Sequence, residues 1–179
     1  MNYTHRDLVY QELNHFLEQH KFNKVLEIGA GGNDNKNAIS SKEVFNSYGI
    51  FDYTGIDFMS TNPEIIKMDA HKLEFPDESF DLVYLCHTFE HLENPIQALR
   101  EIYRVLRKDG FVWMATPNPC EHHIIDKDFD HIFVLEPMQI KKLMAYCGMP
   151  NVTYKQSIYK GHQIPYEKDY NVISIGVKI

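Results

Sequence analysis

The sequence lacks the features that mark membrane-embedded, secreted and disulfide-bonded proteins. It has no apolar run of about 18 residues, so we expect no transmembrane helix. Its start, MNYTHRDLVYQELNHF, is polar and mixed in charge, unlike a secretory signal. It has only three cysteines, Cys86, Cys120 and Cys147, and no Cys-x-x-Cys pair of the kind that binds metals. We therefore expect a cytoplasmic protein with reduced thiols.

The chain also lacks an excess of positive charge. Lys and Arg number 18 against 25 Asp and Glu, which gives a formal net charge of −7. This balance argues against a broad nucleic-acid-binding surface, although a small local RNA site stays open. The sequence shows no internal repeat, low-complexity tract or linker, and its 179 residues fit a single domain. We expect a monomer or a homodimer.

The sequence does contain a short apolar stretch, Val25 to Ile28, followed at once by the turn Gly29-Ala30-Gly31. An apolar run without alternation is typical of a parallel strand that is buried on both faces. A glycine turn after such a strand lets the backbone approach a ligand, because no Cβ stands in the way. A second apolar stretch, Tyr53 to Ile56, ends on Asp57, where an acid can hold ribose hydroxyls. Together these features predict a site for a nucleotide-sized ligand.

Helix-like and strand-like segments alternate along the chain. Helices are predicted over residues 5–20 and 38–48, from Pro95 to Lys108 with Gly110 as the stop, and from Pro137 to Cys147. Strands are predicted over residues 25–28, 53–57, 64–68, 80–85 and 111–115, before an antiparallel hairpin over 151–159 and 172–179. This order predicts an α/β fold, a single-domain Rossmann-like doubly wound sheet that is mostly parallel with a C-terminal antiparallel hairpin strand. Ligands bind such sheets at the carboxyl ends of the strands, and Gly29, Asp57, Asp69 and Cys86-His87 all fall there.

Several motifs resemble those of one enzyme family. The acid in Glu27-x-Gly29-x-Gly31 departs from the dinucleotide pattern G-x-G-x-x-G and resembles motif I of the class I S-adenosylmethionine-dependent methyltransferases. Asp69-Ala70 ends the third strand where that family has an acid and a small residue. The run from Ser79 to Asn118, SFDLVYLCHTFEHLENP through RVLRKDGFVWMATPN, resembles the same family almost word for word. The resemblance covers roughly residues 24 to 119.

The resemblance implies an enzyme that binds S-adenosyl-L-methionine and methylates a small molecule. The glycine turn would pass the methionine part of the cofactor, Asp57 would hold the ribose, and Asp69 would bond the adenine amino group. The cofactor-binding residues that it implies are Glu27, Gly29, Ala30, Gly31, Asp57, Phe58, Asp69, Ala70, His71, Cys86 and His87. The single domain 1–179 would comprise an N-terminal helix in 1–22, a cofactor-binding core in 24–119, and a substrate-side segment with the closing hairpin in 120–179.

Histidines are the candidates for acid–base work, because His transfers protons near neutral pH. His87 and His91 are four residues apart and can share a face of a helical turn, so we expect both to be catalytic. His91 could instead be a packed residue that bonds to the backbone. His87 lies just past the fourth strand, where the resemblance implies that the transferred methyl group sits. His131 reaches the site only if the loop after the fifth strand folds back. We therefore expect catalysis without a metal.

The acceptor and two other function classes stay open. A small hydroxylated acceptor such as a sugar or phenol, methylated on oxygen or nitrogen, suits the late polar and aromatic residues His122, His123, Phe129, His131, Tyr159, His162 and Tyr166. Alternatively, Glu90-His91 with Asp130-His131-Ile132-Phe133 partly resembles the small-RNA terminal ribose methyltransferases, which would make Glu90, His91 and His131 metal ligands. His87 stands where that family has an acid. Asn33 in place of a third glycine disfavours an NAD-linked oxidoreductase, and an inactive cofactor-binding or scaffold protein is the alternative of another class.

Overall fold

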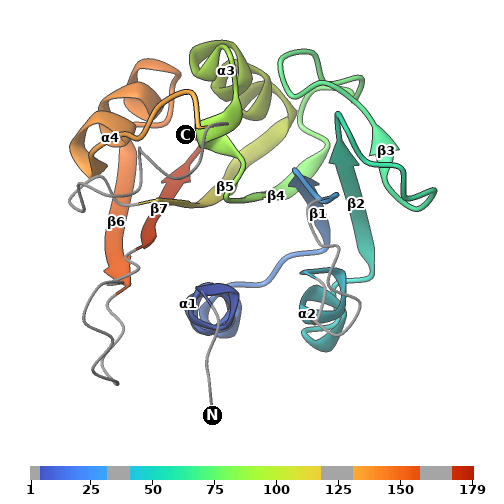
Figure 1. Cartoon of the computed structure of the whole chain (residues 1–179). Coiled ribbons are helices and arrows are strands. Elements are labelled where there is room, and N and C mark those ends of the chain that lie inside the picture. Colours follow the sequence, from blue (N-terminus) through green and yellow to red (C-terminus); the bar gives the residue numbers. More distant parts are fainter. Residues whose placement is uncertain (1–4, 32–40, 118–130, 158–170) are drawn as a thin grey trace.

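The computed structural model describes residues 5–31, 41–117, 131–157 and 171–179. Within them, one sheet is covered by helices on both faces (Figure 1). Its strands are β1 (Lys24–Ile28), β2 (Asp52–Asp57), β3 (Ile66–Lys67), β4 (Phe80–Cys86), β5 (Leu106–Pro117), β6 (Asn151–Ser157) and β7 (Asn171–Val177). The helices are α1 (His5–Gln19), α2 (Ser41–Ser47), α3 (Pro95–Val105) and α4 (Pro137–Tyr146), with a short 3₁₀ turn, η1, at Phe89–His91.

The sheet has the strand order β3-β2-β1-β4-β5-β7-β6. The strands from β3 to β5 in this order pair in parallel, whereas β7 runs antiparallel to both β5 and β6. The chain therefore reverses its direction of travel across the sheet between β1 and β4, which opens a crevice at their carboxyl ends. This topology confirms the α/β, doubly wound and mostly parallel sheet with a C-terminal antiparallel hairpin that the sequence predicts.

Apolar side chains are buried on both faces of the sheet. Along β4, Val83 and Leu85 belong to the core under α3 and α4, while Leu82 and Tyr84 belong to the core under α1 and α2 (Figure 1). The ring of Tyr84 stacks on Trp113 of β5 with centroids 5.2 Å apart. Burial on both sides explains why the central strands appear in the sequence as continuous apolar runs.

Helix α3 begins where the sequence predicts and ends earlier. The Asn94 side chain caps it by accepting a hydrogen bond from the Gln97 backbone N–H at 3.1 Å, and Pro95 opens its first turn. The helix ends at Val105, so the prediction that it runs to Lys108 with Gly110 as its stop is wrong. Leu106 already pairs with Phe80 in the sheet, which draws the chain into β5.

The segment after Leu106 turns at a non-glycine residue. Asp109 has φ +60°, and its N–H donates to the carbonyl of Lys178 at 3.0 Å. The Lys178 N–H in turn donates to the carbonyl of Gly110 at 3.0 Å. Pairing with the C-terminal segment therefore extends β5 well before the predicted start at Phe111.

Smaller differences lie at the edges of the sheet. The predicted strand 64–68 is reduced to Ile66–Lys67, because this edge has little to pack against and Ile66 is 46% exposed. The helix predicted over 38–48 is described as α2, while residues 38–40 lie outside the described residues. Helix α1 and the closing hairpin lie where the sequence predicts them, although residues 158–159 also lie outside. No helix in the described part of the chain has both the length and the apolarity to cross a membrane.

Candidate functional site

The turn after β1 is fixed by its backbone. The N–H groups of Gly29 and Ala30 both donate to the carbonyl of Ile56 at the end of β2, at 2.9 and 3.0 Å. Gly29 has φ +83°, and a Cβ placed on it would collide with the side chain of Thr88 after β4. Only glycine satisfies both conditions, so the loops that follow β1 and β4 approach each other closely here.

Asp57 connects the loops that follow β1 and β2. One carboxylate oxygen accepts hydrogen bonds from the N–H groups of Met59 and Ser60, both at 2.7 Å, and the other accepts one from Gly31 at 3.1 Å. A Cβ on Gly31 would lie 2.7 Å from the carboxyl carbon of Asp57, so this glycine is also required. These three bonds leave part of the acceptor capacity of the carboxylate available to a ligand.

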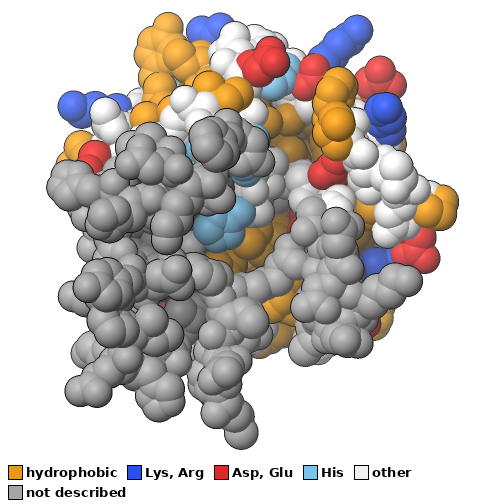
Figure 2. All heavy atoms as spheres, in the orientation of Figure 1, with side chains coloured by type: hydrophobic (Ala, Val, Ile, Leu, Met, Phe, Trp, Pro, Cys, Tyr) orange, Lys and Arg blue, Asp and Glu red, His pale blue; other side chains and the backbone are white. Residues whose placement is uncertain are grey.

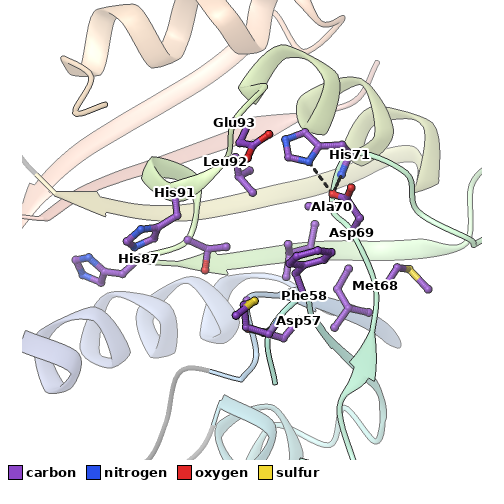
Figure 3. A pocket seen from close by; sticks show the side chains of 15 residues that line it. Asp57, Phe58, Met68, Asp69, Ala70, His71, His87, His91, Leu92 and Glu93 are labelled. Carbon is purple, nitrogen blue, oxygen red and sulfur yellow. Dashed lines mark hydrogen bonds and ion pairs between the residues drawn. The ribbon is translucent and has the colours of Figure 1, made fainter. Parts of the chain in front are cut away.

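Asp69, Ala70 and His71 form a second rigid corner. Asp69 Oδ1 accepts hydrogen bonds from the backbone N–H of His71 at 2.9 Å and from His71 Nδ1 at 2.6 Å, the contact drawn in Figure 3. The backbone hydrogen bond from His71 is the main reason that the pKa of Asp69 lies below its usual value. His71 Nε2 accepts the N–H of Asn94 at 3.1 Å, which puts the ring proton on Nδ1 and ties this corner to the start of α3.

The side chain of Glu27 is buried between β1 and its neighbouring elements. Its buried carboxylate accepts hydrogen bonds from the Ser41 hydroxyl at 3.0 Å and from the Tyr53 hydroxyl at 2.6 Å. Burial, together with the charge of Glu27, raises the pKa of Tyr53 well above its usual value. The contacts tie β1 to α2 and β2 among the described residues.

A cavity of about 620 Å³ opens at the carboxyl ends of β1, β2 and β4. Figure 2 shows histidine side chains gathered at the hollow on this face, bordered by hydrophobic ones. The predicted cofactor residues that line it are Gly29, Asp57, Phe58, Asp69, Ala70, His71 and His87, and those that do not are Glu27, Ala30, Gly31 and Cys86. The predicted catalytic residue His91 also lines it, as do residues that the sequence reasoning missed: Ile28, Ile56, Met59, Met68, Thr88, Leu92 and Glu93.

His87 and His91 reach the cavity by a different route from the one predicted. The sequence reasoning put them on one helical turn, but His87 has φ +50° and the 3₁₀ turn starts only at Phe89. The His87 N–H donates to the carbonyl of Ala115 at 2.9 Å, which holds the bend against β5. Both imidazoles still lie side by side at one end of the cavity, with Asp57 and Phe58 further along it (Figure 3).

Glu90 is a carboxylate buried between histidines. Its side chain is 2% exposed, and Oε1 lies 3.4 Å from His87 Nδ1 and 4.0 Å from His131 Nε2. The imidazole rings of His91 and His131 lie edge to face with centroids 4.9 Å apart. A hydrogen bond of 2.9 Å from the Ile132 N–H to the Glu90 carbonyl brings this part of the chain back to the site. His131 therefore lies beside Glu90 and His91, although it does not line the cavity.

Some of the predicted substrate-side residues lie outside the described residues: His122, His123, Phe129, Asp130, Tyr159, His162 and Tyr166. Of the late histidines that were predicted to surround the acceptor, the structure describes His131. Its place beside Glu90 could be anticipated only through the Asp-His-x-Phe pattern, because the long intervening segment gives no local signal.

Comparison with known proteins agrees with this architecture. A family model described as "Methyltransferase domain" matches residues 26–114. The ubiquinone/menaquinone biosynthesis C-methyltransferase UbiE of Pseudoalteromonas translucida is 33% identical over 69 residues, which cover 38% of this chain and 28% of that protein. The chain therefore spans less than a third of the length of this curated relative.

Two solved structures have the same fold over nearly the whole chain. A SAM-dependent methyltransferase from Archaeoglobus fulgidus has a TM-score of 0.73 at 20% identity, covering 97% of this chain and 94% of that chain. A SAM-dependent methyltransferase from Thermotoga maritima, described as a possible histamine N-methyltransferase, has a TM-score of 0.68 at 17% identity, covering 95% and 89%. At these identities the likeness shows the fold alone.

Replacing Gly29 with alanine tests the close approach of the two loops. Gly29→Ala should lower the free energy of unfolding by more than Gly49→Ala, because Gly49 has a similar φ of +77° but open space around it. We expect a cost of about 1–2 kcal/mol at Gly49 from backbone strain, and about 1–3 kcal/mol more at Gly29 from the collision with Thr88. Urea unfolding measures both values. A Thr88→Ala change should recover part of the extra cost in Gly29→Ala, and equal costs at the two glycines would contradict the argument.

Proposed function

We propose that this chain, which belongs to the class I S-adenosylmethionine-dependent methyltransferases, transfers the methyl group of that cofactor to an oxygen of a small hydroxylated acceptor. The family uses S-adenosyl-L-methionine as the methyl donor. A sugar or a phenol is the class of acceptor that we favour. We favour oxygen over nitrogen as the methylated atom because His87 lies between the cavity and the buried carboxylate of Glu90.

The cofactor would lie along the cavity with its adenine at the far end from the histidines. Asp57, which retains acceptor capacity beyond its three backbone bonds, would take the ribose hydroxyls. Asp69 would accept from the adenine amino group, and the exposed ring of Phe58 would cover the base. The methionine part would pass the Gly29 turn and bring the methyl group toward His87 and His91. Glu27, Ala30, Gly31 and Cys86 would then support the site without lining it.

His87 is suited to remove a proton from a hydroxyl acceptor. If its Nδ1 carries the proton and faces Glu90, the lone pair remains on Nε2, which has no hydrogen-bond partner among the described residues. The acceptor hydroxyl would lose its proton to Nε2 as its oxygen attacks the methyl carbon. The electron pair of the breaking carbon–sulfur bond goes to sulfur, which yields S-adenosylhomocysteine. Such general-base assistance contributes about 10²–10⁴-fold to a rate.

The role of Asp57 can be tested by calorimetry with S-adenosylmethionine and S-adenosylhomocysteine. We expect binding of both by the unaltered protein at micromolar affinity, and a loss of about 10- to 100-fold in Asp57→Ala, because ribose hydroxyls would be left unpaired in a largely dry cleft. Asp52→Ala is the matched control, since Asp52 begins the same strand at its opposite end and its side chain forms an ion pair of 3.7 Å with Lys24. Binding of NAD in place of both cofactor forms would reject the proposal.

The acceptor class can be found by following cofactor turnover against a panel of sugars, phenols, amines and RNA 3′ ends. We expect turnover with a sugar or a phenol, and a product that carries the new methyl group on oxygen. Mass spectrometry of the product identifies the methylated atom. Turnover with RNA alone would overturn the small-molecule proposal, and no turnover with any class despite tight cofactor binding would support an inactive binding protein.

His87→Ala separates catalysis from binding once an acceptor is known. The rate constant kcat should fall about 100-fold or more, while calorimetry should show little change in cofactor affinity. His15→Ala provides the control, because this histidine is exposed on α1 away from the cavity. An unchanged kcat in His87→Ala would show that another group, or none, takes the proton.

A further inference from the structure

We propose that Glu90, His91 and His131 bind a divalent transition-metal ion at the edge of the cofactor cavity. One ligand atom from each residue lies within 4.8 Å of the others. Two imidazoles and one carboxylate form a donor set suited to Zn²⁺, Mn²⁺ or Fe²⁺ and much less to Mg²⁺, which prefers oxygen ligands. Since metal–ligand bonds of about 2.1 Å hold neighbouring ligands of a tetrahedral ion about 3.4 Å apart, modest side-chain rotations would close the three atoms around an ion.

A second observation points to the same place. The carboxylate of Glu90 is 2% exposed, and neither of its oxygens accepts a hydrogen bond from any described residue. A buried carboxylate without such donors is strongly destabilising unless an opposite charge compensates it. The neighbouring side chains that could compensate it are the imidazoles of His87, His91 and His131. A dication bound by the carboxylate would provide the missing charge directly.

Packing and one backbone hydrogen bond hold the three proposed ligands in place. Glu90 and His91 are consecutive in the η1 turn, whose position is fixed by packing of buried Phe89 against Phe133, with ring centroids 5.7 Å apart at 78°. His131 is brought to them by the hydrogen bond from Ile132 to the Glu90 carbonyl. Side chains supported in this way are preorganised for an ion, because little conformational freedom remains to be lost.

The position of the site suggests what the ion does, and this part rests on the proposed function. His91 belongs both to the ligand set and to the cavity wall, so the ion would border the space where the acceptor meets the methyl group. Three protein ligands leave a coordination position for an acceptor hydroxyl, whose pKa the ion would lower. His87 would then take the proton of this hydroxyl, and sulfur would take the electron pair of the breaking carbon–sulfur bond. The sequence alone favoured catalysis without a metal, which makes this a departure from that expectation.

Metal binding can be measured without any acceptor. Protein stripped with chelator should bind Mn²⁺ and Zn²⁺ in a 1:1 ratio by calorimetry, in the presence of S-adenosylhomocysteine, and should bind Mg²⁺ at least about 100-fold more weakly. Glu90→Gln and His131→Ala should each weaken Mn²⁺ binding by about 100-fold or more, whereas His15→Ala should leave it unchanged. Thermal unfolding without metal shows whether each variant is folded. Should Glu90→Gln fail to fold, Mn²⁺ binding by His131→Ala and by the unaltered protein still tests the metal site.

The outcomes separate this proposal from the proposed function. Absence of 1:1 binding of Mn²⁺ or Zn²⁺ by the unaltered protein, or binding that survives His131→Ala, would overturn the metal site and leave methyl transfer untouched. If the ion binds as described, chelator should abolish turnover of the identified acceptor and added Mn²⁺ should restore it. Turnover that persists in chelator would limit the ion to a structural role, while failure to find any acceptor would bear only on the proposed function.

Discussion

The contact between Gly29 and Thr88 is the constraint on which the rest of the site depends. The two residues follow β1 and β4, the neighbouring strands between which the sheet reverses its order. A Cβ on Gly29 would collide with the side chain of Thr88, so this approach of the two loops requires glycine. The carbonyl of Ile56 holds the first loop from one side. The positions of the loops that follow β1, β2 and β4 therefore depend on one another at the cavity.

The parts of the site that sequence reasoning could predict are those attached to buried strands. Gly29, Asp57 and His87 each come directly after an apolar run, and a run that must be buried on two faces fixes where a parallel strand ends. Asp69 also lines the cavity, although its strand is reduced to two exposed residues and the family pattern alone indicated this position. Strand ends thus predict which residues meet, but not how their side chains are oriented.

Glu27 shows that the sequence does not predict how a side chain is oriented. Its sequence position beside Gly29 predicted contact with the ligand, yet its carboxylate bonds to hydroxyls of Ser41 and Tyr53 from two other elements. Those partners are far apart in the sequence and come together only when α2 and β2 pack on β1. The bend at His87 was missed for a similar reason, because a hydrogen bond to Ala115 on β5 overrides the local preference for a helical turn. Tertiary contacts therefore determine both the orientation of the Glu27 carboxylate and the bend at His87.

The buried carboxylate of Glu90 links the two proposed properties of the site. It lies beside His87, the proposed proton acceptor, and beside His131, a proposed metal ligand. A dication bound to one of its oxygens would compensate the charge of this carboxylate. Because a carboxylate has acceptor capacity for both the ion and the Nδ1–H of His87, the two need not compete. One buried carboxylate would thus both orient His87 through Nδ1 and hold the ion, which joins the proposed proton acceptor to the proposed metal site.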